Sequence, residues 1–281
     1  MTLLAFKQKL YTTLESHYPK TELDSFFKLI LEDILELSKI DFALNPNMEV
    51  SGDSISKINK ILNGLSQHQP IQHLIGFTEF MDLKLEVNQH VLIPRPETEE
   101  LILWILNDFS KTISPNILDI GTGSGCIPIA LSKKLENAKV STIDVSNKAI
   151  ETAKRNATYN KADVQFLHQD ILATEKLTAT YDVIVSNPPY VRNLEKVEIE
   201  KNVLDYEPHL ALFVADDDPL IFYKKIAELA LISLKPNGAL YYEINQYLGK
   251  ETVELLQNIG FKNIELKKDV FGNHRMIKAS V

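Results

Sequence analysis

The chain has 281 residues, of which 44% are hydrophobic and 24% charged, and its formal net charge is -8 at pH 7. This length allows one large domain and a small one, and the composition is that of an ordinary globular protein. The negative charge gives no attraction for a phosphate backbone, so it disfavours a nucleic-acid substrate. The single cysteine, Cys126, excludes an intrachain disulfide. The histidines are not clustered at ligand spacings, so we expect no metal ion. No signal peptide or membrane span is predicted at the N-terminus, and we expect a cytoplasmic protein.

Residues 1–75 show apolar residues at helical spacing and no strand pattern. The run from Leu4 to Leu14 predicts a first helix, Thr21 is expected to cap a second, and a third is predicted over Ser54–Leu65. Three short helices would form a small bundle. The bundle could be a structural cap on the larger domain, or it could bind a partner.

Residues 76–96 change character. Apolar and polar residues alternate over Phe77–Phe80 and again over Leu83–Val87, which predicts a β-hairpin linker. The linker ends at Pro94-Arg95-Pro96, where two prolines favour an extended, stiff segment. A helix is then predicted over Glu97–Leu106, with acidic residues in its first turn.

From Asn116 onward, apolar runs alternate with helical segments, and this predicts a doubly wound α/β sheet. Only five residues separate the last two runs. A connection this short favours an antiparallel pairing, because a parallel crossover needs more chain. The predicted strands are Asn116–Ile120, Lys139–Asp144, Val164–His168, Asp182–Ser186, Ala239–Ile244, Ile264–Lys268 and His274–Ala279.

Three glycines at alternate positions follow the first predicted strand, in the run Gly121-Thr122-Gly123-Ser124-Gly125. Glycine permits a sharp turn and lets a ligand approach the backbone closely. Such a turn between a strand and a helix is typical of nucleotide or adenosyl binding, although it could be purely structural. The spacing is not that of G-x-G-x-x-G and no Walker lysine follows, which disfavours a dinucleotide site and a P-loop.

Two aspartates follow later strands. Asp144 lies about twenty residues after the glycines, where a carboxylate accepts hydrogen bonds from the ribose of NAD or of S-adenosylmethionine. It could instead cap the helix that opens near Ser146. Asp170 follows the third strand and could accept the exocyclic amine of an adenine, or lie in a surface loop. Ile171 beside it could pack on the adenine face or in the core.

The tetrapeptide Asn187-Pro188-Pro189-Tyr190 follows the fourth predicted strand. It would face the glycine turn if the strand order reverses between the first and fourth strands, since ligands bind at such switch points. The Asn187 side-chain oxygen and the Pro188 carbonyl could accept both hydrogens of a substrate amide nitrogen, held rigid by the prolines. Tyr190 could stack on the planar amide. The pattern predicts methyl transfer from a sulfonium donor, and a plain turn is the alternative.

With these motifs the chain resembles the HemK-type glutamine-N5 methyltransferases, which modify peptide chain release factors. The resemblance covers nearly the whole length. Its most specific part is the Ile-Pro-Arg-Pro-Glu-Thr-Glu segment, whereas Asn-Pro-Pro-Tyr is shared with adenine-N6 methyltransferases. The matching segments are 69–76, 79–80, 91–99, 121–125, 144–146, 187–190 and 206–208.

The resemblance implies a seven-stranded class I methyltransferase sheet, with its last strand antiparallel, over residues 97–281. It implies that Gly121–Gly125 and Asp144 contact S-adenosylmethionine, which would leave as S-adenosylhomocysteine. Asn187 is also expected to contact this cofactor. Asn187–Tyr190 would hold the glutamine of a Gly-Gly-Gln loop, and methylation would modulate translation termination. Two positions depart from the family pattern: Ile171 stands where an aromatic residue is common, and Asn245 where a glycine is usual.

The stretch from Val191 to Asp218 has few structural signals, and long loops often serve as lids or binding surfaces. We hypothesise that it closes over the glutamine and contacts the release factor, and that the helical N-terminal residues also bind it. We expect a monomer. Three alternatives are an adenine-N6 methyltransferase acting on DNA or RNA, an NAD-dependent oxidoreductase, and an adaptor that has lost turnover.

Overall fold

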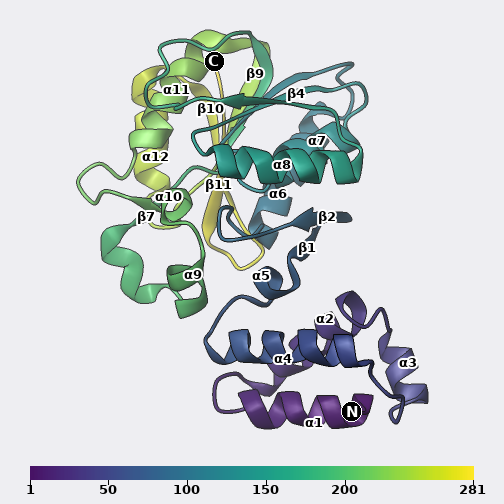
Figure 1. Ribbon diagram of the computed structural model, residues 1–281. Coiled ribbons are helices and arrows are strands. Elements are labelled where there is room, and N and C mark those ends of the chain that lie inside the picture. The colour runs from purple at the N-terminus through teal and green to yellow at the C-terminus, as the bar shows by residue number, and fades with distance from the viewer. The chain divides into compact units, whose positions relative to one another are not determined.

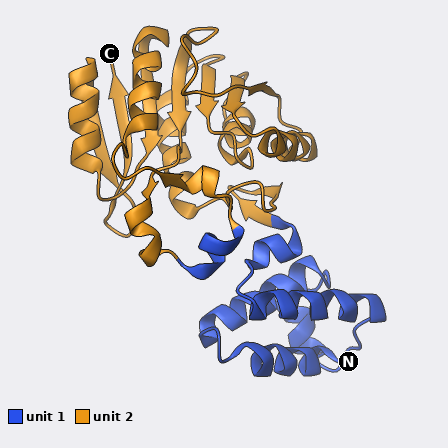
Figure 2. Cartoon of the chain, turned by 60° about the vertical axis from the view of Figure 1, so that its left-hand side comes forward, with its two compact units in different colours: residues 1–77, 200–206 blue, residues 78–199, 207–281 orange.

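The computed structural model describes all 281 residues, which form two compact units. The first unit contains residues 1–77 and 200–206, and the second contains residues 78–199 and 207–281 (Figure 2). The short 200–206 segment was not expected in the first unit. None of the helices has the length and apolar character needed to cross a membrane.

The first unit is helical. Its core is built from α1, α2 and α4, whose inward residues pack together with Ile71. Helix α1 begins at Leu3, which is buried, whereas Leu4 is 41% exposed. The helices of this unit are α1 (Leu3–Leu14), α2 (Lys20–Asp33), α3 (Lys39–Leu44), α4 (Gly52–Ser66), α5 (Ile71–Ile75) and α9 (Lys201–Tyr206) (Figure 1).

Two local features of this unit differ from the sequence prediction. The residue before α2 is Pro19, not Thr21, and no side chain caps the helix. Pro19 is itself extended, with ψ 156°, and the helix begins directly after it. In addition, α3 and α5 were not predicted. Helix α3 has six residues and buries none of them, and it is too short for a repeated apolar pattern to be detected.

The second unit contains a seven-stranded sheet in the order β10-β11-β9-β6-β3-β4-β5. Strand β11 is antiparallel to both of its neighbours, whereas β9, β6, β3, β4 and β5 are mutually parallel. The chain leaves β3 towards β4 and β5 and then returns to β6, so the strand order reverses between β3 and β6. The strands are β3 (Asn116–Ile120), β4 (Lys139–Asp144), β5 (Val164–His168), β6 (Tyr181–Ser186), β9 (Leu234–Glu243), β10 (Lys262–Lys268) and β11 (His274–Ser280).

Helices cover both faces of this sheet (Figure 1). Side chains alternate along each strand, so Ile117 packs towards α6 and α7, while Leu118 packs towards α11 and α12. The doubly wound fold with an antiparallel last strand is therefore confirmed. The helices are α6 (Pro96–Phe109), α7 (Cys126–Lys134), α8 (Asn147–Asn160), α10 (His209–Leu212), α11 (Ile221–Ser233) and α12 (Gly249–Ile259).

Short elements complete the molecule. The hairpin β1 (Phe77–Phe80) and β2 (Leu83–Glu86) turns through Met81 and Asp82, both with positive φ. The stretch 191–218 carries more regular structure than its sequence indicates. It contains β7 (Val191–Arg192), the 3-10 helix η1 (Asn193–Glu198), α9, α10 and β8 (Phe213–Val214), and β7 pairs with β8.

Candidate active site

The glycine turn directly follows β3, which ends at Ile120. Gly121, Gly123 and Gly125 all have positive φ, at 94°, 52° and 85°. A Cβ on Gly125 would lie 2.9 Å from Ile129 Cδ1 and 3.1 Å from Ala153 Cβ, so this position also requires close packing. A Cβ on Gly123 would meet nothing within 4 Å. The turn therefore leaves open space beside its backbone before α7 begins at Cys126.

Asp144 closes this turn from the end of β4. Its Oδ2 accepts a hydrogen bond from the Gly123 N–H at 3.0 Å, and its Oδ1 accepts one from the Ser146 N–H at 2.8 Å. Burial raises the pKa of Asp144, and the backbone donors of Ser146 and Gly123 oppose that shift. The side chain of Ser146, not Asp144, caps α8 by accepting from the Ala149 N–H. The carboxylate keeps lone pairs for a ligand in the adjacent cavity.

A second carboxylate, Asp119, lies buried under the turn, and the sequence predicts no role for it. The Thr142 hydroxyl donates to Asp119 Oδ2 at 2.6 Å and is itself 2.6 Å from the Thr122 hydroxyl. Asp119 Oδ1 has no hydrogen-bond partner in the protein. This chain of contacts supports the turn from below. A carboxylate at the end of an apolar strand was the available signal.

Burial raises the pKa of Asp119 to about 8, with the nearby charge of Asp144 adding to it. The folded protein therefore keeps this proton while the unfolded chain, with a pKa near 3.8, has released it. We expect this group to make stability fall as pH rises from about 4 to 8. Asp119→Asn should remove that component, so its thermal midpoint should drop less between pH 5 and pH 8 than that of the wild type. Parallel pH profiles would contradict this.

Asp170 and Ile171 lie beyond β5. The Asp170 side chain accepts a hydrogen bond from the Leu172 N–H at 2.9 Å and is exposed, while Ile171 is 8% exposed and packs with the core of the second unit. Both residues also line the cavity described below. Asp170 therefore lies in an exposed loop and Ile171 packs in the core, and both face the cavity.

The Asn-Pro-Pro-Tyr segment follows β6, which pairs in parallel with β3 so that Ser186 lies opposite Ile120. The Ser186 hydroxyl donates to the Ile120 carbonyl at 2.6 Å. A Cβ on Gly121 would lie 3.6 Å from the Asn187 carbonyl oxygen. The tetrapeptide and the glycine turn are thus neighbours at the switch point of the sheet, as the sequence predicts.

The members of this segment face different surroundings. Asn187, Pro188 and Pro189 line the cavity, and Asn187 Nδ2 donates to the Thr98 hydroxyl oxygen at 3.4 Å. Tyr190 is not among the lining residues. Its ring packs against the core and its hydroxyl donates to Glu243 Oε1 at 3.1 Å. The structure therefore brings three of the four residues to the cavity and gives Tyr190 a supporting position.

The proline-rich segment before α6 forms a third wall, and Glu207 fixes it. The buried Glu207 carboxylate accepts from the Ile93 N–H at 3.0 Å and forms an ion pair with the Arg95 guanidinium. The next residue, Pro208, also lines the cavity. The sequence segments 91–99 and 206–208 are therefore joined here through a contact that spans more than a hundred residues of chain.

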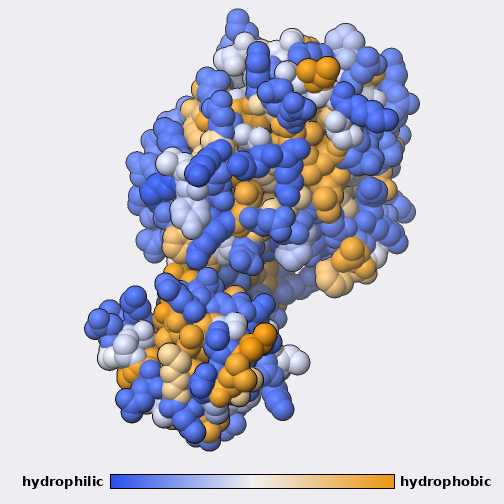
Figure 3. Space-filling view, turned by 90° about the vertical axis from the view of Figure 1, so that its right-hand side faces the viewer, coloured by the Kyte–Doolittle hydropathy of each residue, from blue (hydrophilic) through white to orange (hydrophobic).

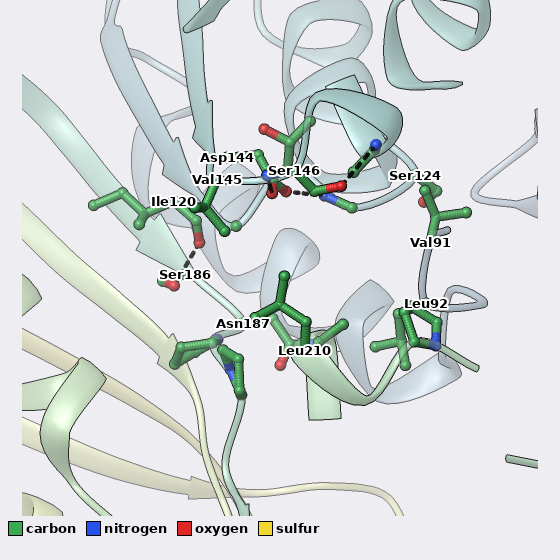
Figure 4. A pocket seen from close by; sticks show the side chains of 18 of the residues that line it. Val91, Leu92, Ile120, Ser124, Asp144, Val145, Ser146, Ser186, Asn187 and Leu210 are labelled. Carbon is green, nitrogen blue, oxygen red and sulfur yellow. Dashed lines mark hydrogen bonds between the residues drawn. The ribbon is translucent and has the colours of Figure 1, made fainter. Parts of the chain in front are cut away.

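These three walls enclose a cavity of about 240 Å³. Figure 4 shows Asp144, Val145 and Ser146 on one side of it and Asn187 and Leu210 across from them. The lining is mostly apolar and its few polar groups converge from strand ends, as in small-molecule sites. The structure contains no cluster of three or more His, Cys, Asp or Glu side chains that could hold a metal ion.

Two family models match the chain. The model described as "Methyltransferase small domain" matches residues 102–207, and the model described as "PrmC N-terminal domain" matches residues 8–76. The second match coincides with most of the first unit, and the first contains the glycine turn and the Asn-Pro-Pro-Tyr segment.

Curated relatives match over the full length. The chain is 52% identical to a release factor glutamine methyltransferase of Flavobacterium psychrophilum, covering 100% of this chain and 99% of the relative. It is 40% identical to the protein of the same name from Bacteroides thetaiotaomicron, covering 95% and 96%. Among solved structures, a Thermus thermophilus 16S rRNA N2 G1207 methyltransferase, in complex with AdoMet and guanosine, matches with a TM-score of 0.51 at 18% identity. This match covers 72% of the chain and 49% of that protein, and it shows a shared fold.

Proposed function

Because the chain belongs to the release factor glutamine methyltransferase family, we propose that it methylates the side-chain amide nitrogen of the glutamine in a release factor Gly-Gly-Gln loop. The observation that carries the proposal is the position of Asn187. It lines the cavity at the end of β6, next to the glycine turn. Its Nδ2 donates a hydrogen bond to the Thr98 hydroxyl oxygen at 3.4 Å.

The chemistry of an amide explains why such an acceptor is useful. The amide nitrogen is a poor nucleophile because its lone pair is delocalised into the carbonyl. Asn187 Oδ1 and the Pro188 carbonyl would accept its two hydrogens and hold the nitrogen in one orientation, which increases the rate by positioning. Pro188 is buried and Pro189 follows it, so the Pro188 carbonyl does not have to reorganise during the reaction.

The residues of the glycine turn fit an adenosyl cofactor, and S-adenosylmethionine would supply an electrophilic methyl group on its sulfonium. Gly123 leaves space that a Cβ would occupy, so the backbone from Gly121 to Gly125, with Thr122 and Ser124 between the glycines, would line the cofactor. Asp144 would accept hydrogen bonds from the ribose hydroxyls. Asp170 would accept the adenine amine while Ile171 contacts the ring. The product, S-adenosylhomocysteine, would contact the same residues.

Mass spectrometry of a release factor tests the proposal. The factor is incubated with the protein and S-adenosylmethionine, digested, and the Gly-Gly-Gln peptide is fragmented. We expect a gain of one methyl group on the glutamine. A parallel incubation with DNA and RNA oligonucleotides tests the adenine-N6 alternative, and methylation of the oligonucleotides alone would overturn the proposal.

The surface that binds the protein substrate is proposed to include the first unit and the 191–218 stretch. Figure 3 shows apolar side chains at the surface of the first unit, and exposed ones in and after α3 are Ile40, Leu44 and Met48. In the second unit, Leu194 and Val197 of η1 are 55% and 90% exposed. We propose that a monomer presents both surfaces to the release factor.

A double substitution tests the second of these surfaces. Leu194→Asp with Val197→Asp should lower kcat/KM about tenfold on the intact release factor, because two apolar contacts would be lost and charge introduced. Turnover of a short Gly-Gly-Gln peptide should not change. Ile113→Asp, at an 88% exposed position before β3, is the matched control. Equal loss on peptide and intact factor would contradict a role in docking.

A further inference from the structure

A buried chain of hydrogen bonds leads from Asn187 into the protein. Asn187 Nδ2 lies 3.4 Å from Thr98 Oγ1, and Thr98 Oγ1 lies 2.6 Å from Glu243 Oε2. The other carboxylate oxygen, Glu243 Oε1, lies 3.1 Å from the Tyr190 hydroxyl. Thr98 is 2% exposed and Glu243 is 1% exposed, so solvent does not compete for these groups.

The number of available protons decides which group is the donor in each of these hydrogen bonds. An ionised carboxylate can only accept hydrogen bonds, so Glu243 accepts one from the Tyr190 hydroxyl at Oε1 and one from the Thr98 hydroxyl at Oε2. A threonine hydroxyl has a single proton. Because this proton is used in the hydrogen bond to Glu243, the Thr98 oxygen can only accept from Asn187. The group of Asn187 that faces Thr98 must therefore be the donor Nδ2. The acceptor Oδ1 is then turned to the cavity.

Two hydroxyl donors and the positive charge of Arg275 stabilise the ionised form of Glu243 against the cost of its burial. Burial raises the pKa of Glu243 and the charge of Glu97 adds to the rise, and the hydrogen bonds from Thr98 and Tyr190 together with Arg275 offset only part of it, so the pKa stays above its usual value. Burial also raises the pKa of Tyr190, so the phenol keeps its proton and remains a donor. The Arg275 side chain is held by Asp269 at 3.3 Å.

The geometry points to Thr98 as a positioning residue. Because the Thr98 hydroxyl donates to Glu243, it accepts from Asn187 Nδ2 and so orients the Asn187 amide with Oδ1 facing the substrate nitrogen. This inference rests on the proposed function. An unlocked asparagine could rotate and present two N–H groups to the substrate amide, and donor would then face donor. Thr98 itself lines the cavity, and in this scheme its hydroxyl acts on the substrate through Asn187.

Two substitutions at Thr98 separate this role from packing. Thr98→Val keeps the shape and removes the hydroxyl, whereas Thr98→Ser keeps the hydroxyl and removes a methyl group. We expect Thr98→Val to lower kcat by about tenfold to a hundredfold, in line with loss of one oriented polar group, with KM for S-adenosylmethionine unchanged. Thr98→Ser should retain most of the wild-type kcat. The reverse order would show that Thr98 serves packing and would overturn the inference.

A double variant tests whether Thr98 acts through Asn187. If it does, Thr98→Val combined with Asn187→Ala should be no slower than Asn187→Ala alone, because the second change has nothing left to orient. If the fold-loss in kcat of the double variant equals the product of the two single losses, the inference is overturned. If the wild type does not methylate a release factor at all, the proposed function fails instead, and that result is seen before any variant is compared.

Neutron diffraction from crystals of the wild-type protein with S-adenosylhomocysteine gives a test that needs no variant to fold. The deuteron of the Thr98 hydroxyl should point to Glu243, and the deuterated amide of Asn187 should point to Thr98. A Thr98 deuteron directed at Asn187 would overturn the inference whatever the substrate of the enzyme.

Discussion

Asn187→Ala is expected to reduce methyl transfer to the release factor glutamine by about 10²–10³-fold, which is the usual cost of removing one preorganised hydrogen-bonding group at a reacting centre. The substitution removes the side-chain acceptor that lines the cavity and leaves the Pro188 carbonyl in place. Initial rates of methyl incorporation, measured at saturating release factor and cofactor, give the loss in kcat.

Binding of S-adenosylhomocysteine to the same variant should remain within a few-fold of the wild type, because the glycine turn and Asp144 are unchanged. Asn107→Ala, at an exposed position in α6, is the matched control for the loss of an asparagine. Normal turnover by Asn187→Ala would remove the basis of the proposed function. A loss of cofactor binding equal to the loss of rate would place Asn187 in the cofactor site instead.

Strands β3 and β6 could be predicted because most of their residues are buried and they read as nearly continuous apolar runs, whereas the edge strand β5 alternates and buries none of its residues. The bounds of β3, β4 and β5 agree with the predicted ranges. Strand β9 begins at Leu234. Its predicted start, Ala239, is too late because Lys235, Pro236 and Asn237 carry no strand signal. Its pairing with β6 is irregular over the same stretch, between Tyr181 and Val183.

The 191–218 stretch could not be predicted, because its elements are short and are stabilised by partners distant in sequence. Glu195, at 5% exposure, accepts a hydrogen bond from Asn245, fifty residues away. Asn245 also donates to the Tyr190 carbonyl at 3.0 Å and accepts from the Tyr247 N–H at 2.9 Å. The departure from glycine at this position therefore has a structural consequence: the asparagine joins the segment after Pro189 to η1.

The same reason limited prediction of the site. Motif reasoning found the glycine turn, Asp144 and Asn187, which are contiguous with strand ends. It did not find Thr98 or Glu243 as partners, since they are 145 residues apart in the chain and meet only when α6 packs beside β9. A glutamate at the end of the apolar run Leu240–Tyr242 was the available signal, because a carboxylate there must be paired when the strand is buried.

Asp144→Ala is expected to weaken the binding of S-adenosylhomocysteine by at least about a hundredfold. Each hydrogen bond to a charged group contributes roughly 1.5–3 kcal/mol, and the proposed ribose contacts would both be lost. The change would also release the Gly123 N–H, which Asp144 Oδ2 holds at 3.0 Å, so the turn itself would become less ordered.

Titration calorimetry with S-adenosylhomocysteine measures this affinity, and Asp163→Ala, at an exposed position before β5, is the matched control. Asp144→Asn should lie between the two, because an amide keeps one acceptor and loses the charge. This order follows from the position of one carboxylate at the end of β4, where it can serve the turn and the ribose at once. Unchanged affinity in Asp144→Ala would show that the carboxylate only stabilises the turn, through its hydrogen bond with the Gly123 N–H, and does not contact the cofactor.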